Sequence, residues 1–371
     1  MMRNIIFATG TRADFSKLLP LANVASEFAE EVIFFATGMH LLKKYGLTIE
    51  EVRQKSKGRV HEFLNQSVDD AQDIVLAKTM LGFGDFLRET EADMVVVHGD
   101  RVEALAIALS AVMNNVLVMH VEGGEVSGTI DESIRHCISK AAHIHMVSSE
   151  DAANRLRRMG ESSDMIHIIG SPELELHKKT ENLPLSDAFS HYDLDFDDYG
   201  IFLMHPVTTE LHNLPEQLVA VTDAMHRSDK NFVVILPNND PGTSQIVEAI
   251  ETLDRKRFRV FSSMRFEYFS SLLRNASVIV GNSSVGVREA PFLGIGSVNI
   301  GTRQNNRASG QSITHLDGFD ADAILMAITD LWGKRFPVDE SFGDGGVSQK
   351  FRLAMTSLAK GAVALQKSYV D

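Results

Sequence analysis

Short runs of apolar residues alternate with longer amphipathic stretches along almost the whole chain. The runs are continuous, as expected for parallel strands that are buried on both faces. In the first half they predict strands at residues 3–9, 31–37, 94–97, 116–121, 143–148 and 165–170. Apolar residues at helical spacing predict helices at 15–28, 68–89 and 150–159, and a polar stretch at 43–59 predicts helix and loop. This alternation is typical of a doubly wound α/β sheet.

A second alternation follows residues 171–198, which contain two prolines and the acidic run YDLDFDD and are predicted to be a linker. Strands are predicted at 200–204, 232–236, 258–261, 277–280 and 296–300, and helices at 214–227, 244–253, 266–273, 285–292 and 321–332. A last helix is predicted at 349–368. We therefore predict two domains, 1–178 and 179–348, followed by a C-terminal helical segment, 349–371, that packs back on the first.

Composition and charge narrow the class of protein. The 371 residues are 44% hydrophobic and 23% charged, which is ordinary for a globular protein long enough for two domains. A formal net charge of −14 argues against nucleic acid or an anionic membrane as partner. Cys137 is the single cysteine, which leaves no intrachain disulfide or cysteine-based zinc site. No apolar window approaches the length of a membrane span, and the apolar start is too short for a signal peptide. We expect a cytoplasmic protein.

Carboxylates follow two neighbouring strands and open a helix. The strand at 94–97 runs into His-Gly-Asp100-Arg, the strand at 116–121 runs into Glu122-Gly-Gly-Glu, and Asp131 begins the next helix. The carboxyl ends of strands form the ligand crevice of open α/β sheets. Like charges held together are costly unless a substrate or cation uses them. The sequence therefore predicts a functional centre at Asp100, Glu122 and Asp131.

Three turns have the composition of a phosphate site. The turn GNSSVGVRE follows a strand and opens a predicted helix, whose N-terminus with Ser283 and Ser284 favours a phosphate, while Glu289 is placed to accept from a ribose diol. Arg12 lies in the turn GTRADF, which lacks the G-x-G-x-x-G fingerprint, so NAD is not expected. Arg303 lies in the turn GTRQNNR, and the arginine fork suits a diphosphate.

Further polar residues at strand ends have two interpretations each. His205 ends the strand at 200–204 and is either structural or an acid–base group opposite the carboxylates. Asn238 and Asp240 lie in PNNDPG, which is turn chemistry first and a possible contact for sugar hydroxyls second. No H-E-x-x-H spacing is present, so we expect no metal.

Several long motifs, taken together, resemble one family. The segments are GTRADFSK, VHGDR, HVEGGEVSGTIDESIRH, IGSPE, HPVTTE, GNSSVGVREAP and GTRQNNR, and the similarity runs over nearly the whole chain. They resemble the UDP-N-acetylglucosamine 2-epimerases, above all the hydrolysing branch that opens bacterial sialic acid synthesis. The resemblance implies a glycosyltransferase-B-type fold of two Rossmann-like domains with the active site in the cleft between them. It also implies a cytoplasmic homodimer or homotetramer that needs no cofactor.

The reaction implied by the resemblance converts UDP-GlcNAc and water to N-acetylmannosamine and UDP, through elimination to 2-acetamidoglucal and then hydration. By position, Asp100, Glu122 and Asp131 match the family's carboxylates, and His205 matches the histidine that contacts the diphosphate or assists proton transfer. Contacts with UDP are implied for Arg12, Ser283, Ser284, Glu289 and Arg303, and contacts with the sugar for Arg101, Asn238 and Asp240.

Alternatives stay open within and beyond this family. The motifs TIDE, HGDR and GTRAD favour the hydrolysing branch, whereas a non-hydrolysing UDP-GlcNAc 2-epimerase resembles GTRPE and HGDT. A hydrolysing UDP-N,N′-diacetylbacillosamine 2-epimerase of the legionaminic acid pathway has nearly the same motifs. A glycosyltransferase of the same fold and a non-catalytic nucleotide-sugar sensor are further alternatives. The sequence does not assign base and acid among the three carboxylates.

Overall fold

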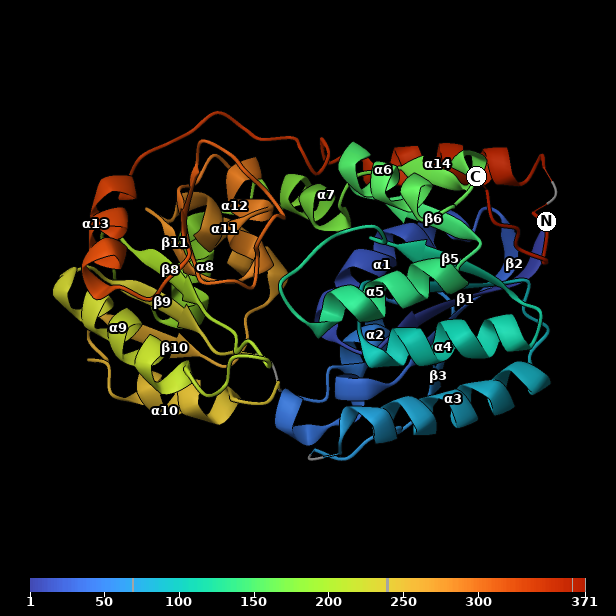
Figure 1. Cartoon of the computed structure of the whole chain (residues 1–371), viewed down its shortest axis with the longest axis horizontal. Helices are drawn as coiled ribbons and strands as arrows, with labels where there is room; N and C mark the ends of the chain where they lie inside the picture. Colours follow the sequence, from blue (N-terminus) through green and yellow to red (C-terminus); the bar gives the residue numbers. More distant parts are fainter. Residues whose placement is uncertain (69, 238–239, 362, 371) are drawn as a thin grey trace. The chain divides into compact units, whose positions relative to one another are not determined.

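The computed structural model describes residues 1–68, 70–237, 240–361 and 363–370. The chain divides into two compact units (Figure 1). Unit 1 comprises Met1–Glu125, Asp131–Glu175 and Phe342–Asp371, and unit 2 comprises Val126–Ile130 and Leu176–Ser341. Each unit contains one parallel sheet with helices on both faces, so the predicted α/β class with two Rossmann-like sheets is confirmed.

The sheet of unit 1 has the order β3-β2-β1-β4-β5-β6-β7. Its strands are β1 Met2–Thr9, β2 Ala29–Ala36, β3 Arg59–Glu62, β4 Met94–His98, β5 Leu117–Val121, β6 Ile144–Val147 and β7 Ile166–Ile168. All six predicted strands of the first half are confirmed to within two residues. The edge strand β3, RVHE, was missed because its residues are half-buried or exposed and show no apolar run.

The helices of unit 1 follow the strands in regular alternation. They are α1 Arg12–Ala25, α2 Ile49–Lys55, α3 Gln72–Glu89, α4 Val102–Met113, α5 Ile130–Ala141 and α6 Glu150–Arg158, with short 3₁₀ turns η1 Gly38–Leu41, η2 Lys43–Tyr45 and η3 Ser163–Met165. Helix α1 begins three residues before the predicted start. The reason is a capping box, in which Thr11 N donates to Asp14 Oδ1 (2.8 Å) and Asp14 N donates to Thr11 Oγ1 (3.3 Å).

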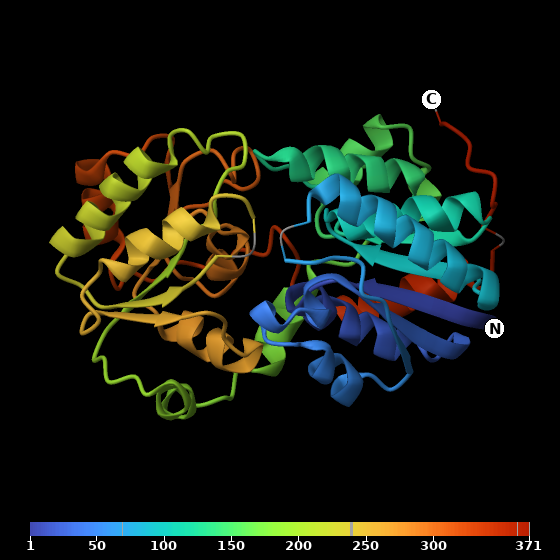
Figure 2. The same ribbon diagram turned by 90° about the horizontal axis from the view of Figure 1, so that it is seen from below.

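The last helix, α14 Val347–Leu358, packs on α1 in unit 1. Phe351 and Met355 share a core with Phe7 and Leu18, while α3 and α4 cover the other face of the sheet (Figure 2). The prediction that this helix continues to residue 368 was wrong. The described residues beyond Leu358 are not helical, and this segment binds the end of α5 instead: Lys367 Nζ donates to Ala142 O (2.7 Å) and Lys140 O (2.7 Å).

The same tail completes a buried ion-pair cluster around Glu161, whose side chain is 1% exposed. The carboxylate contacts Lys140 (2.9 Å), His145 (3.1 Å) and Lys367 (2.5 Å). Burial by itself raises the pKa of Glu161, but hydrogen bonds from His145, Lys367 and Lys140 outweigh it and lower the pKa to about 2. The carboxylate is therefore ionised in the folded protein well below neutral pH.

This cluster predicts an acid-dependent loss of stability. The folded-state pKa of about 2 lies below the ordinary 4.5, so the stabilisation is complete above pH 4.5 and is lost as the pH falls towards 2. The shift corresponds to roughly 3 kcal/mol. We expect Glu161→Gln to lower the free energy of urea unfolding at pH 6, with a gap to wild type that narrows at pH 3. Parallel stability curves for the two proteins would contradict this, and the exposed Glu91→Gln serves as the control.

The sheet of unit 2 has the order β10-β9-β8-β11-β12-β13, again all parallel. Its strands are β8 Gly200–Leu203, β9 Phe232–Ile235, β10 Phe258–Phe261, β11 Ile279–Gly281, β12 Ser297–Ile300 and β13 Ile313–Leu316. The five predicted strands are confirmed. The edge strand β13 was missed for the same reason as β3, since its residues are half-buried or exposed.

The helices of unit 2 correct two predictions. They are α8 Leu185–Tyr192, α9 Leu214–Arg227, α10 Thr243–Glu251, α11 Phe266–Asn275, α12 Glu289–Phe292 and α13 Ala321–Leu331, with the 3₁₀ turn η4 Ser284–Gly286; α7 Pro172–Lys179 begins in unit 1 and ends in unit 2. The predicted linker at 171–198 thus holds two helices. The predicted helix at 285–292 is broken between η4 and α12, because Pro291 has no N–H to bond to Val287 O.

None of the described helices combines the length and apolar character needed to cross a lipid bilayer.

Candidate functional site

Glu122 is the most enclosed of the predicted carboxylates, with 5% of its side chain exposed at the carboxyl end of β5. Its backbone has a positive φ of 62°, and its N–H donates to Met146 O (2.9 Å). The carboxylate Oε2 contacts His98 Nε2 (2.8 Å) and Lys17 Nζ (3.2 Å), and Oε1 accepts from Ser171 Oγ. One positive charge and further hydrogen bonds therefore hold the carboxylate in one orientation.

Asp100 lies at the end of the neighbouring strand, after Gly99, whose φ of 72° makes the turn. Arg135 of α5, with 3% of its side chain exposed, donates through Nη2 to Asp100 Oδ2 and through Nη1 to Glu125 O (3.1 Å). Asp131 is half-buried in the first turn of α5, four residues before Arg135 and so on the same face of the helix. The fold therefore places Asp131 one helical turn from the arginine that binds Asp100.

A buried histidine binds the turn that precedes Asp100. His120 of β5 contacts Gly99 O through Nε2 (2.8 Å) and Ser139 Oγ of α5 through Nδ1 (3.0 Å). Burial is the main cause that lowers the pKa of His120 to about 3, so the ring is neutral at physiological pH. A neutral ring with an acceptor at Gly99 donates from Nε2 and accepts from Ser139 at Nδ1. His120 thus joins the turn after β4 to α5.

In unit 2, Asn282 forms hydrogen bonds with two of the residues predicted to contact the nucleotide, His205 and Arg303. It follows Gly281, whose φ is 134° and where a Cβ atom would lie 2.0 Å from Leu203 O. The Asn282 amide accepts from His205 N (2.7 Å) and donates to His205 O (2.8 Å), and its own carbonyl accepts from Arg303 Nη1 (3.3 Å). His205 and Arg303, from separate strand ends, are thereby held at one asparagine.

His205 is 8% exposed, and its Nδ1 is buried without a hydrogen-bond partner among the described residues. Burial and then the charge of Arg303 lower the pKa of His205 to about 3. The imidazole is therefore neutral at physiological pH. In that form it can donate one N–H to a phosphate or sugar oxygen, but it does not add a second positive charge to Arg303.

The GNSSVGVRE segment forms a short 3₁₀ turn where a helix was predicted. Ser283 is 7% exposed and accepts weakly from Val285 N (3.4 Å), and Ser284 opens the 3₁₀ turn η4. The serines therefore cap one short turn and do not open the predicted helix, so no helix dipole favours a phosphate there, while the contacts of Ser283, Ser284 and Glu289 with UDP stay predictions. Glu289 is 8% exposed and contacts His177 Nε2 at 2.6 Å.

The remaining predicted residues lie apart from these contacts or outside the described chain. Arg12 pairs with Glu51 (2.7 Å), and Arg101 pairs with Glu103 (3.2 Å). Asp240 lies in the bend before α10, and Asn238 falls outside the described residues. Their assigned contacts with UDP or sugar stay predictions.

Several residues that hold the predicted groups were not singled out from the sequence. They are Lys17, His98, His120, Arg135, Ser171 and Asn282. Two had a sequence signal: Arg135 follows Asp131 by one helical turn, and Lys17 is a cation among apolar positions of α1. The others become partners only through the order of strands in the sheet.

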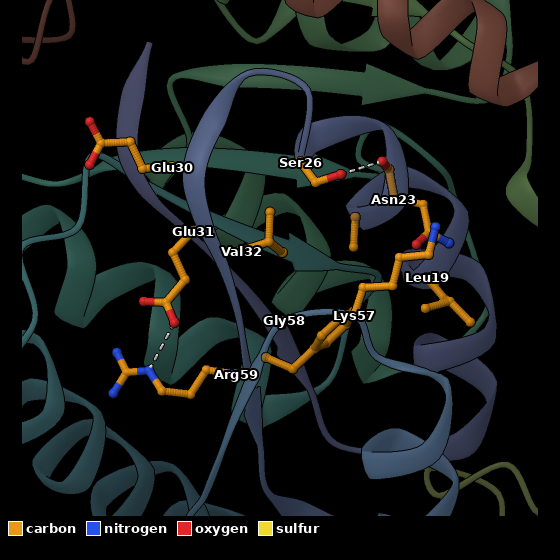
Figure 3. Close-up of a pocket in the computed structure, with 11 residues that line it drawn as sticks. Leu19, Asn23, Ser26, Glu30, Glu31, Val32, Lys57, Gly58 and Arg59 are labelled. Atoms are coloured by element: carbon orange, nitrogen blue, oxygen red, sulfur yellow. Dashed lines mark hydrogen bonds and ion pairs between the residues drawn. The ribbon is translucent and has the colours of Figure 1, made fainter.

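A cavity of about 270 Å³ lies elsewhere in unit 1, between α1 and the strands β2 and β3 (Figure 3). Glu30, Glu31 and Val32 place it at the amino end of β2, and Glu31 pairs with Arg59 across its rim (3.5 Å). Ligands of open parallel sheets bind at the carboxyl ends of strands. None of the predicted site residues lines this cavity, so it is separate from the site. Among the described residues, no group of three or more His, Cys, Asp or Glu side chains is arranged to hold a metal ion.

Comparison with known proteins gives three concordant findings. A family model described as UDP-N-acetylglucosamine 2-epimerase matches residues 24–356. A UDP-N-acetylglucosamine 2-epimerase of Neisseria meningitidis is 41% identical over 375 residues, covering 100% of this chain and 99% of the relative. A UDP-N,N′-diacetylbacillosamine 2-epimerase (hydrolyzing) of Legionella pneumophila is 33% identical, covering 94% of each chain.

A solved structure agrees in fold. The crystal structure of a Neisseria meningitidis UDP-GlcNAc 2-epimerase bound to UDP-GlcNAc superimposes with a TM-score of 0.81 at 15% sequence identity, covering 96% of this chain and 100% of that one. At this identity the likeness supports the architecture of two parallel α/β sheets.

Proposed function

Because the chain belongs to the UDP-N-acetylglucosamine 2-epimerase family, we propose that it is a hydrolysing member, which converts UDP-GlcNAc and water to N-acetylmannosamine and UDP. The observation that carries the hydrolysing assignment is Asp131, in the motif TIDE at the start of α5, one turn from the arginine that binds Asp100. The Legionella relative, whose name includes the word hydrolyzing, supports the same branch. The product would supply sialic acid biosynthesis.

The chemistry begins with departure of UDP from C1 of the sugar. The hydrogen at C2 is barely acidic, so positive charge develops at C1 and O5 before that proton is removed. Carboxylates fixed beside this charge stabilise it. Glu122, enclosed and oriented by Lys17, His98 and Ser171, suits this electrostatic role. Arg303 and the neutral His205 are the proposed contacts of the leaving diphosphate.

Proton transfer requires a more accessible group. Asp100 keeps 30% of its side chain exposed and is held by Arg135, so we assign to it the removal of the C2 proton. The product of elimination is 2-acetamidoglucal. Water then adds to C1 while a proton returns to C2 from the opposite face, and Asp131 is the group we assign to this second transfer. The inversion at C2 follows because the base that removes the proton and the acid that returns one act on opposite faces of the sugar ring.

A reaction in deuterated water tests this function. Incubation with UDP-GlcNAc should release UDP and free N-acetylmannosamine that carries deuterium at C2, without added metal or NAD. Product lacking deuterium at C2 would reject the proton-transfer mechanism. Intact UDP-N-acetylmannosamine would instead identify a non-hydrolysing epimerase, and turnover only after addition of an acceptor would identify a glycosyltransferase.

The second candidate substrate is UDP-N,N′-diacetylbacillosamine, because the Legionella relative with that name is 33% identical. Both UDP-sugars should be assayed side by side at equal concentration. We expect the higher kcat/KM with UDP-GlcNAc, since the Neisseria relative named for that sugar is more similar, at 41%. From the resemblance to the family we also propose that the protein is a cytoplasmic homodimer or homotetramer.

A further inference from the structure

A buried histidine in unit 2 has no role in the function proposed so far. His177, near the end of α7, is 0% exposed and packs its ring on Phe266, with 4.9 Å between ring centres. Its Nε2 lies 2.6 Å from Glu289 Oε2, and its Nδ1 lies 2.7 Å from Ser270 Oγ. Both ring nitrogens are therefore engaged, in opposite directions, by side chains from α11 and α12.

The serine, histidine and glutamate resemble a hydrolytic triad in their contacts, but burial excludes that role. Ser270 is 0% exposed, and its Oγ also contacts Thr180 Oγ1 (2.8 Å). A nucleophile that no substrate can reach does not catalyse acyl transfer. A ligand can reach this hydrogen-bonded series of side chains only at Glu289, whose side chain is 10% exposed.

We propose that His177 is a positioning residue that orients the Glu289 carboxylate to accept hydrogen bonds from the ribose hydroxyls of a uridine nucleotide. A glutamate carboxylate rotates freely about its last bond unless one oxygen is held. Here His177 holds Oε2, while Oε1 has no hydrogen-bond partner among the described residues. Accepting from a vicinal diol requires a fixed rotation, which this single short contact provides. The inference rests on the proposed function, because that function identifies the ligand as a uridine nucleotide.

Two substitutions of similar size and polarity separate orientation from packing. In His177→Gln the side-chain amide can reach the position of Nε2 and still donate to Glu289. In His177→Asn the shorter side chain reaches only the position of Nδ1, on the Ser270 side. The control is Ser271→Ala, on the same helix as Ser270: Ser271 is 1% exposed and donates to Leu183 O (3.1 Å) without contacting His177.

The readout is the affinity for UDP divided by the affinity for 2′-deoxy-UDP, measured by calorimetry on the full chain. We expect wild type to prefer UDP by about tenfold or more, the scale of one hydrogen bond to a charged group. His177→Asn should bring this ratio close to one, mainly through weaker UDP binding. His177→Gln and Ser271→Ala should keep most of it. A loss of stability shared by all three variants lowers the melting temperature but leaves the ratio of the two affinities unchanged.

A double-mutant cycle tests whether His177 acts through Glu289. In a Glu289→Gln background, His177→Asn should cause no further loss of the ratio. Equal loss of UDP and 2′-deoxy-UDP affinity in His177→Asn, or a wild-type ratio near one, would overturn the proposal. If wild type binds UDP with this preference but does not hydrolyse UDP-GlcNAc, the proposed function fails and the role of His177 stands.

Discussion

Replacing Glu122 with glutamine is expected to lower kcat for UDP-GlcNAc by about 100-fold or more, the scale of one acid–base or charge-stabilising group. The amide keeps the size of the side chain but removes the negative charge that we propose stabilises the developing positive charge on the sugar. It also removes one of the two carboxylates that pair with Lys17, whose Nζ contacts Glu173 Oε1 (3.2 Å) as well, and it leaves the His98 ring beside a neutral group. Measured UDP affinity should change far less than kcat.

Glu161→Gln is the matched control for Glu122→Gln. Both carboxylates are buried in unit 1, and each contacts lysine and histidine side chains. If loss of a buried ion pair were enough to impair the enzyme, the two variants would lose activity together. We expect Glu161→Gln to lose stability while it keeps kcat within a few-fold of wild type. Wild-type turnover in Glu122→Gln would remove Glu122 from the mechanism.

Each strand that could be predicted from the sequence contains at least one buried apolar residue, even the edge strands β7 and β10, whereas β3 and β13 contain none. Residues of β4 and β8, for example, are almost all buried, so their apolar runs are continuous and unambiguous. All residues of the edge strands β3 and β13 are half-buried or exposed, so their sequences contain no apolar run and resemble those of loops. The break between η4 and α12 was in principle visible in Pro291, but the helical spacing of the apolar residues concealed it.

The carboxylate groups were predictable for a different reason. Parallel strands end at one edge of a sheet, so polar residues after β4 and β5 must lie near each other whatever the details. Which cations and donors hold these groups depends on contacts between distant segments. Lys17 and Glu122 are 105 positions apart, and no local pattern links them. The turn containing Asn282 was predicted from the sequence. Its hydrogen bonds to the His205 backbone could not be predicted, because they depend on the pairing of β8 with β11.

Arg303→Ala is expected to raise the Kd for UDP by about 10- to 100-fold, because a charge-assisted contact with phosphate is worth more than a neutral hydrogen bond. The side chain is half-buried and held at Asn282 O (3.3 Å), so its guanidinium is oriented before the nucleotide binds. Arg303→Lys should recover part of the affinity, since it restores the charge but not the planar fork.

The control for Arg303 is Arg227→Ala, which removes a cation of the same unit that pairs with Asp223 and Asp322 on the surface. We expect it to leave the Kd for UDP unchanged, which would show that net charge alone does not account for the effect. Raising the salt concentration should weaken UDP binding to wild type more than to Arg303→Ala, because one fewer cation then faces the diphosphate. Equal Kd values for wild type and Arg303→Ala would place the diphosphate elsewhere. They would also leave the neutral His205 without the neighbouring charge that our assignment of the leaving-group site requires.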